Sequence, residues 1–278
     1  MEYFNRRKHL WVFFCVVVLF GANWLHAQSA ATDTQKEVVI TQPAKPWGVT
    51  LASGFDSLYI FRGVNVIPGS PLYWVQPTLT YNFTKQDSLS IGAWYAVGLH
   101  QSAYQELDIV TSYTHTIGNW ALSAGYIFYY VPVTDGAYPF YSNEVNAGVS
   151  YTFDFKWIKI RPNTFYYFNI GPNFQHNGYS PNAASYLQNR VDFSIPVYKD
   201  IIELDPWVAL NFNFRYNAQQ DGHYFNGINN FEYGVRVPIK VTNWMTVSGY
   251  VASTNQWNHL VNTASSLIYF GGQVSLTY

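Results

Sequence analysis

The chain of 278 residues carries a formal net charge of −1, with 11% charged and 19% aromatic residues. Ordinary soluble domains contain ~25% charged residues, so this composition argues against one, and the near-neutral charge gives no reason to expect nucleic acid as a partner. A single cysteine, Cys15, excludes a disulfide framework.

Residues 1–27 have the pattern of a secretory signal peptide. Basic residues at 6–8 precede an apolar run at 10–20, and a cleavage point follows at Ala27. The run is shorter than the ~20 residues that a membrane-spanning helix needs, so we reject a helical anchor. Cys15 lies inside the run and not at a cleavage point, so we also reject a lipoprotein anchor. Cleavage would leave no cysteine for thiolate catalysis or metal binding.

Residues 28–46 are polar and predict a flexible periplasmic lead-in. The same segment could instead fold back as a plug, which is the less favoured interpretation.

From residue 47 onward the chain shows short segments in which apolar and polar side chains alternate, without a helical period. The predicted strands are 47–61, 72–83, 89–100, 105–116, 120–131, 144–153, 157–169, 186–197, 201–216, 228–239, 244–253 and 266–278. About twelve strands of this length predict an all-β fold over 47–278, a transmembrane antiparallel up-and-down β-barrel.

The connections between these strands alternate in length. Short connections follow the even-numbered strands, at 84–88, 117–119, 154–156, 198–200 and 240–243. Most odd-numbered strands are followed by longer ones, at 62–71, 132–143, 171–185, 217–227 and 254–265. Outer-membrane barrels have short periplasmic turns and long outer loops, so the pattern predicts that both termini are periplasmic. A soluble β-sandwich has no reason to show it.

Charged residues share one face of most strands, and large apolar residues occupy the other face. Placing an Arg or Lys at the bilayer midplane costs ~2–4 kcal/mol, so the charged face is expected to line the lumen. The lumen or constriction candidates are Asp56, Arg62, Glu106, Asp108, Glu144, Lys159, Arg161, Arg190, Asp192, Arg215, Glu232 and Arg236, with Glu203 and Asp205 on the same face. Arg62 is the leading candidate for the mouth or constriction. The near balance of signs favours ion pairing inside the wall over a ring of one sign.

Aromatic residues fall into two predicted groups. The same assignment of faces points Trp74, Trp94, Tyr129, Phe165, Tyr167, Trp207 and Tyr269 inward. These rings either fill space or form a contact track for flat-faced solutes. Trp47, Trp120, Trp157 and Trp244 stand at or near the starts of upward strands and predict a periplasmic girdle.

The last predicted strand separates an apolar face from a polar one. Phe270, Val274, Leu276 and Tyr278 form the apolar face, and the residues between them are mostly polar. This strand resembles the closing strand of bacterial outer-membrane barrels. The resemblance implies that the terminal aromatic is part of a signal read by the barrel-assembly machinery. The expected surroundings are outer-membrane lipid and lipopolysaccharide.

Enzymatic motifs are absent from the sequence: it contains neither GxSxG nor HExxH, and no enzymatic activity is expected. His100, His176, His223 and His259 fall in or beside four different outer loops. A shared metal site at the barrel mouth is conceivable, but these histidines lack local ligand spacing, so we expect no metal and no cofactor.

Several segments resemble the TorF-like porin family. The first is 51–63, ending Tyr-Ile-Phe-Arg-Gly, which is similar to a Ser-Asp-Tyr-x-Phe-Arg-Gly pattern that opens the barrel in that family. The stretches 106–113, 124–132 and 144–151 are also similar. In this chain the motif is stretched, because Asp56 lies three residues before Tyr59. The resemblance implies a bacterial outer-membrane barrel and a channel.

The sequence therefore predicts passive passage of small solutes through a narrow lumen of mixed charge. Two alternatives stay open: a closed barrel that acts in the envelope or through its outer loops, and an outer-membrane enzyme that modifies lipids.

Overall fold

The computed structural model describes residues 46–100, 104–132, 140–170, 173–175, 178–180, 184–260 and 265–278. The predicted signal peptide (1–27) and all but the last residue of the lead-in (28–46) lie outside these ranges. No helix among the described residues is long and apolar enough to cross a membrane.

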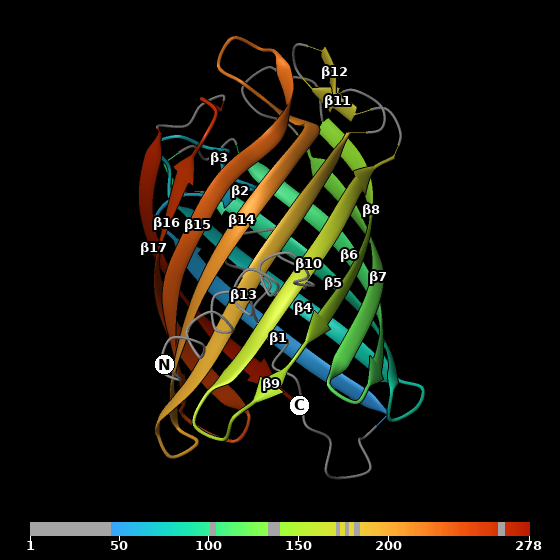
Figure 1. Ribbon diagram of the computed structural model, residues 1–278, viewed down its shortest axis with the longest axis vertical. Helices are drawn as coiled ribbons and strands as arrows, with labels where there is room; N and C mark the ends of the chain where they lie inside the picture. Colours follow the sequence, from blue (N-terminus) through green and yellow to red (C-terminus); the bar gives the residue numbers. More distant parts are fainter. Residues whose placement is uncertain are drawn as a thin grey trace, which may run out of the picture.

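The described residues form one closed antiparallel barrel (Figure 1). Its twelve long strands are β1 (Trp47–Asp56), β4 (Leu72–Asn82), β5 (Asp87–Gly98), β6 (Gln105–Ile117), β7 (Trp120–Val131), β8 (Phe140–Tyr151), β10 (Lys159–Asn169), β13 (Ser185–Tyr198), β14 (Ile202–Ala218), β15 (Tyr224–Lys240), β16 (Met245–Gln256) and β17 (Ser266–Thr277). The short strands are β2 (Ile60–Phe61), β3 (Val64–Asn65), β9 (Phe153–Asp154), β11 (Asn173–Gln175) and β12 (Gly178–Ser180).

The long strands follow one another around the wall in chain order, and the last strand returns to the first. β17 pairs with β1 from Thr50 opposite Thr277 to Asp56 opposite Gly271. This pairing leaves the main sheet without a free long edge, which is what a spanning sheet requires. The predicted twelve-stranded, all-β antiparallel barrel is confirmed. The placement of its termini in the periplasm stays a prediction.

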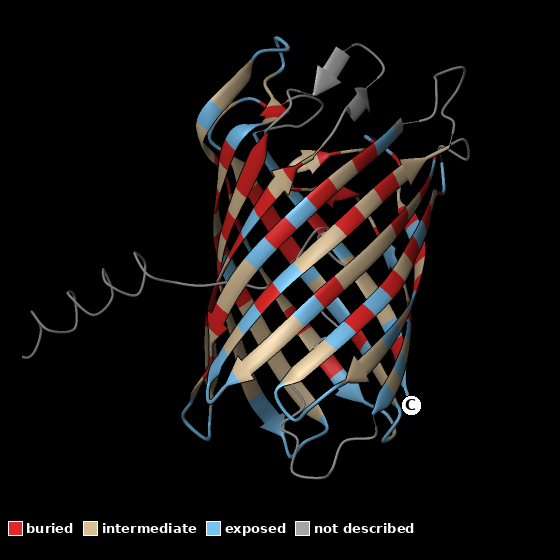
Figure 2. Cartoon of the chain, turned by 90° about the vertical axis from the view of Figure 1, so that its right-hand side faces the viewer, coloured by how far each residue is buried: buried red, intermediate tan, exposed pale blue. Residues whose placement is uncertain are grey.

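Side chains alternate between the inside and the outside of the wall. Figure 2 shows buried and exposed bands alternating along the strands. On β4, for example, Trp74 is 1% exposed and its neighbour Tyr73 is 47% exposed. On β17, Phe270 and Val274 are exposed while Tyr269 and Ser275 are buried. The two faces therefore follow the period of two expected for strands with different environments on each side.

The four tryptophans of the predicted girdle are all exposed on the outside of the barrel. Trp47 and Trp120 begin β1 and β7, whereas Trp157 and Trp244 stand just before β10 and β16. All four therefore belong to the end of the barrel where Tyr278 lies, here called the lower end (Figure 1). Trp244 stacks on Tyr278, with ring centroids 6.2 Å apart. Their contact with a membrane interface stays a prediction.

The first predicted strand is too long by five residues. β1 ends at Asp56, and residues 57–71, here called the inward loop, turn into the barrel instead of forming an outer loop (Figure 1). Within this loop Tyr59, Ile60 and Ile67 are buried. Alternation alone could not show this turn, because an apolar residue suits both a lipid-facing wall and a packed interior.

The predicted inward position of Arg215 is wrong. The register of β14 shifts between Phe214 and Ala218, and Arg215 has a positive φ of 61°. Beyond this β-bulge the faces are exchanged, because a bulge inserts one unpaired residue into the strand. Arg215 is consequently exposed, and Tyr216 turns inward to donate a hydrogen bond to Glu144.

Candidate functional site

The tip of the inward loop is a two-residue turn that joins β2 to β3. Arg62 and Gly63 both have positive φ, 50° and 82°, as the type I′ turn of a tight hairpin requires. A Cβ atom on Gly63 would also lie 2.9 Å from the side chains of Asn229 and Asn230. Two independent constraints therefore select glycine here, which gives the Phe-Arg-Gly motif a structural role.

The guanidinium of Arg62 forms a buried ion pair with Glu144 of β8. Arg62 Nη2 donates to Glu144 Oε1 at 2.6 Å, Nη1 donates to Oε2, and both side chains are 1% exposed. Tyr129 and Tyr216 donate to the same carboxylate at 3.2 and 3.0 Å. The Tyr167 ring lies 4.1 Å from the guanidinium carbon. Burial acts to lower the pKa of Arg62, but Glu144, Tyr216 and Tyr129 together outweigh it and raise the pKa, so Arg62 stays charged.

The backbone of the same tip is bound from the other side of the lumen. Asn217 of β14 and Asn229 of β15 donate to the Arg62 carbonyl at 3.0 and 2.8 Å. Gln256, the last residue of β16, donates to the Gly63 carbonyl at 2.5 Å. Glu144, Asn217, Asn229 and Gln256 are here called the clamp. It holds the inward loop to β8 through the side chain of Arg62 and to β14, β15 and β16 through the backbone carbonyls of the tip.

Sequence reasoning identified Glu144 but missed the three amides of the clamp. Asparagine is depleted in β-strands, yet β14 and β15 contain several. These are Asn211, Asn213, Asn217, Asn226, Asn229 and Asn230. Five of them, all except Asn226, are buried. That enrichment is the one signal in the sequence that pointed to a polar cluster at this height.

Buried carboxylates in the middle of the barrel accept hydrogen bonds from aromatic residues. Asp56 accepts from Trp74 Nε1 at 3.0 Å and from the Tyr250 hydroxyl at 2.6 Å. Glu232 accepts from Trp207 Nε1 at 3.2 Å. These contacts satisfy acidic groups that would otherwise be costly to bury.

Tyr104 adds a further contact of this kind, because its hydroxyl donates to Glu106 at 2.5 Å. Tyr59 of the inward loop also faces Glu106. Burial, together with the charge of Glu106, raises the pKa of both tyrosines well above the usual range, so both remain hydroxyl donors. We call these carboxylates and their aromatic partners the carboxylate–aromatic layer.

The predicted lumen aromatics belong to this level of the barrel. Trp74, Trp94, Tyr129, Phe165, Tyr167, Trp207 and Tyr269 are all buried. They pack the interior and, at Trp74, Tyr129 and Trp207, they also hold carboxylates. A direct contact with a passing solute stays a prediction.

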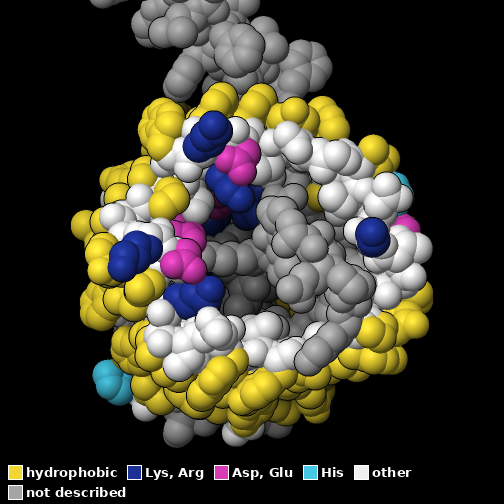
Figure 3. Space-filling view, turned by 90° about the horizontal axis from the view of Figure 1, so that it is seen from below, with side chains coloured by type: hydrophobic (Ala, Val, Ile, Leu, Met, Phe, Trp, Pro, Cys, Tyr) yellow, Lys and Arg dark blue, Asp and Glu magenta, His cyan; other side chains and the backbone are white. Residues whose placement is uncertain are grey.

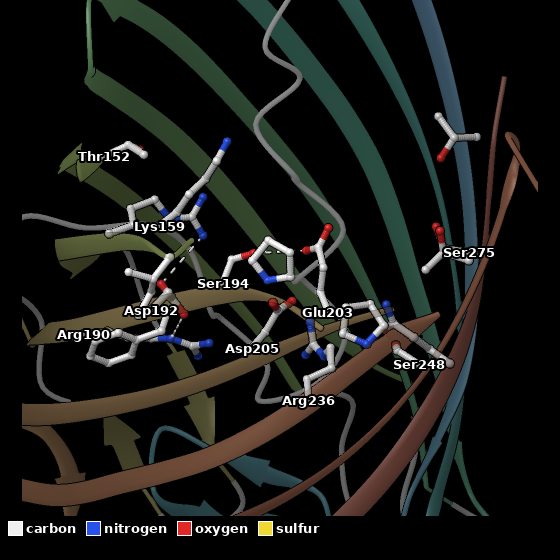
Figure 4. Close-up of a pocket in the computed structure, with 18 of the residues that line it drawn as sticks. Thr152, Lys159, Arg190, Asp192, Ser194, Glu203, Asp205, Arg236, Ser248 and Ser275 are labelled. Atoms are coloured by element: carbon white, nitrogen blue, oxygen red, sulfur yellow. Dashed lines mark hydrogen bonds and ion pairs between the residues drawn. The ribbon is translucent and has the colours of Figure 1, made fainter. Parts of the chain in front are cut away.

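A cavity of about 400 Å³ lies in the lower part of the barrel. Figure 4 shows its lining, and Figure 3 shows charged side chains gathered on one side of the hollow seen from below. Its basic lining residues are Lys156, Lys159, Arg161, Arg190 and Arg236, and its acidic ones are Asp192, Glu203 and Asp205. Five of the predicted lumen residues, together with Glu203 and Asp205, are thus brought to one place.

Asp192 is the centre of charge pairing in this cavity. It accepts a hydrogen bond from Arg190 Nε at 2.6 Å, and Arg161 Nη2 lies 3.7 Å from its other oxygen. Arg190 also lies over the Trp207 ring at 4.9 Å. Glu203 accepts from Ser194 Oγ at 3.0 Å. The charges therefore pair along one wall.

The predicted lumen residues consequently separate into two levels. Asp56, Arg62, Glu106, Asp108, Glu144 and Glu232 belong to the buried middle, and Lys159, Arg161, Arg190, Asp192 and Arg236 line the lower cavity. Arg215 belongs to neither.

The structure offers no metal site within the ranges it describes, because no three His, Cys, Asp or Glu side chains gather there. His176 lies outside those ranges, so the idea of a shared histidine site is tested only for the other three loop histidines.

A closed barrel with an apolar outer face and a polar, charged interior defines the class of transmembrane β-barrels. Within that class, the chain belongs to a bacterial family of unknown function, Gcw_chp, whose profile matches residues 40–205. The resemblance to TorF-like porins stays an expectation. No curated protein matches the chain.

Solved structures share the fold. The COG4313 outer membrane channel from Pseudomonas putida F1 aligns with a TM-score of 0.53 and 10% identity, over 85% of this chain and 97% of that chain. The NanC porin aligns with a TM-score of 0.50 and 10% identity, over 82% of this chain and 98% of that chain. At these identities the similarity concerns the fold alone.

Proposed function

We propose that the protein is an outer-membrane channel through which small solutes pass passively. The observation that carries this proposal is the polar, charged interior of a closed barrel, narrowed by a loop that is held inside it. The apolar outer face suits a lipid environment, and the shared fold with an outer-membrane channel and a porin supports the same function.

The path begins at the lower cavity and is narrowest at the inward loop. Eight-stranded barrels are filled by side chains and sixteen-stranded barrels leave an aqueous channel, so twelve strands suit a narrow passage. The inward loop and the carboxylate–aromatic layer occupy the middle of that passage. Movement of the loop would widen it, and the clamp therefore sets the conductance.

Purified protein in a planar lipid bilayer tests the proposal. Discrete conductance steps are expected from a heat-modifiable, folded barrel. A folded barrel of the natural sequence that stays silent would rule out the channel.

The buried middle favours one alternative, a closed barrel that acts through its outer surface. Arg62 and Gly63 at the tip of the inward loop are buried, and so are the three carboxylates of the carboxylate–aromatic layer. The two functions differ in one outcome. A closed barrel gives no steps with the natural sequence and conducts only when the clamp is disrupted, whereas a channel conducts in both forms.

A further inference from the structure

One side of the lower cavity presents three cations on a short stretch of chain. Lys156, Lys159 and Arg161 all line it, and they come from the turn before β10 and the start of that strand. Lys159 pairs at 3.4 Å with Asp154, where both side chains are about half exposed, so this pair is weak.

The guanidinium of Arg161 has an N–H donor that makes no hydrogen bond. Its Nε is buried and has no hydrogen-bond partner, and the 3.7 Å separation of its Nη2 from Asp192 is too long for a hydrogen bond. Asp192 is already bound by Arg190 and Asn163. The fork of Arg161 can therefore take a second anionic group, and Arg binds a carboxylate through two parallel hydrogen bonds.

The net charge of the cavity also favours an anionic solute. Its described lining contains five basic and three acidic residues, an excess of two positive charges. Since this field is enclosed by the barrel wall, it favours anions over cations inside the cavity.

The other side of the cavity is uncharged and rich in hydrogen-bonding groups. Its lining from β16 and β17 consists of Thr246, Ser248, Gln273, Ser275 and Thr277. Figure 4 shows Ser248 and Ser275 across the cavity from Lys159 and Asp192. Such a face can exchange hydrogen bonds with the hydroxyl groups of a solute. The cavity, at about 400 Å³, lies within the ~300–1,000 Å³ typical of small-molecule sites.

We propose that the lower cavity is a transit-binding site for small hydroxylated carboxylates. Arg161 and Lys159 bind the carboxylate, and the face formed by β16 and β17 binds the hydroxyl groups. This inference rests on the proposed channel and specifies the class of solute that it carries.

Calorimetric titration of the detergent-solubilised full barrel with sodium gluconate tests the site, with glucose as a neutral probe of similar size. Gluconate is expected to bind at constant ionic strength and glucose to give no measurable heat. Arg161→Gln should weaken gluconate binding at least about 10-fold, because it removes a charged, bidentate donor. Arg215→Gln is the matched control: the same change at an exposed arginine outside the lumen should leave binding unaltered.

A second variant, Arg161→Lys, keeps the site testable if Arg161→Gln fails to fold. It keeps the charge but loses the fork, so binding should fall between that of the natural protein and that of Arg161→Gln. Equal binding of gluconate and glucose, or unchanged affinity in a folded Arg161→Gln barrel, would overturn the site.

Bilayer recordings separate the two proposals. Conductance without a preference for gluconate would contradict the proposed binding site but not the proposed channel. Gluconate binding without conductance in any variant would support the proposed binding site and contradict the proposed channel.

Discussion

Arg62 shows how much of the interior depends on single side chains. Two buried charges cost several kcal/mol each to remove from water, and only good pairing offsets that cost. The pair with Glu144 has two hydrogen bonds between the charged groups and two tyrosine hydroxyls on the carboxylate. Removing either Arg62 or Glu144 would leave the other charge buried and unpaired, which is strongly destabilising.

Glu144→Gln is expected to release the inward loop. The change keeps the shape of the side chain but leaves Arg62 buried without a counterion, which costs ~3–5 kcal/mol for an isolated buried charge. Mean single-channel conductance in a planar bilayer should rise several-fold. Glu203→Gln, at a cavity carboxylate outside the clamp, should leave the conductance within about a factor of two. Unchanged conductance in both variants would show that the clamp does not limit the passage.

Gly63→Ala is expected to destabilise the barrel more than Gly69→Ala. Both glycines have positive φ, 82° and 77°, so both variants carry the ~1–2 kcal/mol strain of a left-handed alanine. Only at Gly63 does the new Cβ meet the amides of Asn229 and Asn230, since a Cβ added to Gly69 would have no neighbouring atom within 4 Å. Urea unfolding in lipid vesicles should show Gly63→Ala less stable by at least ~1 kcal/mol. Equal stability of the two variants would contradict this packing.

The strands themselves could be predicted from the sequence because their two faces meet different solvents. On β14, Val208 faces outward and Trp207 inward, so hydrophobic size and polarity alternate along the strand. Charge carried the same information, because Arg190 and Asp192 on β13 could occupy only the polar side. A strand in a uniformly apolar core would have given no such signal.

The inward loop and the bulge could not be predicted, because their causes are not local. The partners of Arg62 lie 82, 155 and 167 residues along the chain, at Glu144, Asn217 and Asn229. No sequence pattern within 57–71 indicates partners that lie so far along the chain. At Arg215 one extra residue exchanges the faces, and nothing in the alternation marks where it is inserted. The inward positions of the charged candidates other than Arg215 could therefore be predicted, but the three amides of the clamp and the separation into two levels could not.

Val251→Lys tests the outward face of β16. Val251 is exposed near the middle of its strand, where a Lys in lipid costs ~2–4 kcal/mol. Val241→Lys makes the same change at an exposed position in the lower turn after β15, where the cost near an interface is ~0–1 kcal/mol. The free energy of unfolding in lipid vesicles should fall further for Val251→Lys than for Val241→Lys. Equal costs would place Val251 outside the hydrocarbon region.

At the scale of the whole molecule, closure depends on β1 meeting β17. Tyr278 exchanges backbone hydrogen bonds with Val49, at 2.9 and 3.2 Å, and stacks on Trp244. Its ring therefore stands where the seam reaches the lower end. Reading of this ring by the barrel-assembly machinery stays a proposal.

Tyr278→Ala is expected to lower the fraction of assembled barrel in cells while leaving the conductance of each assembled channel unchanged. The backbone hydrogen bonds of residue 278 remain possible, so the loss concerns the ring alone. Phe83→Ala, at another exposed aromatic of the lower end, should assemble normally. Heat-modifiability on gels measures the assembled fraction. Equal assembly of both variants would remove the proposed signal.

The clamp also has a mechanical consequence. A hydrogen-bonded wall fixes the circumference of a tube but leaves its cross-section free to flatten. The hairpin tip is tied to β8 through its guanidinium and to β14, β15 and β16 through its carbonyls, so it acts as an internal strut. At that height the strut, and not the number of strands, sets how round the tube can be.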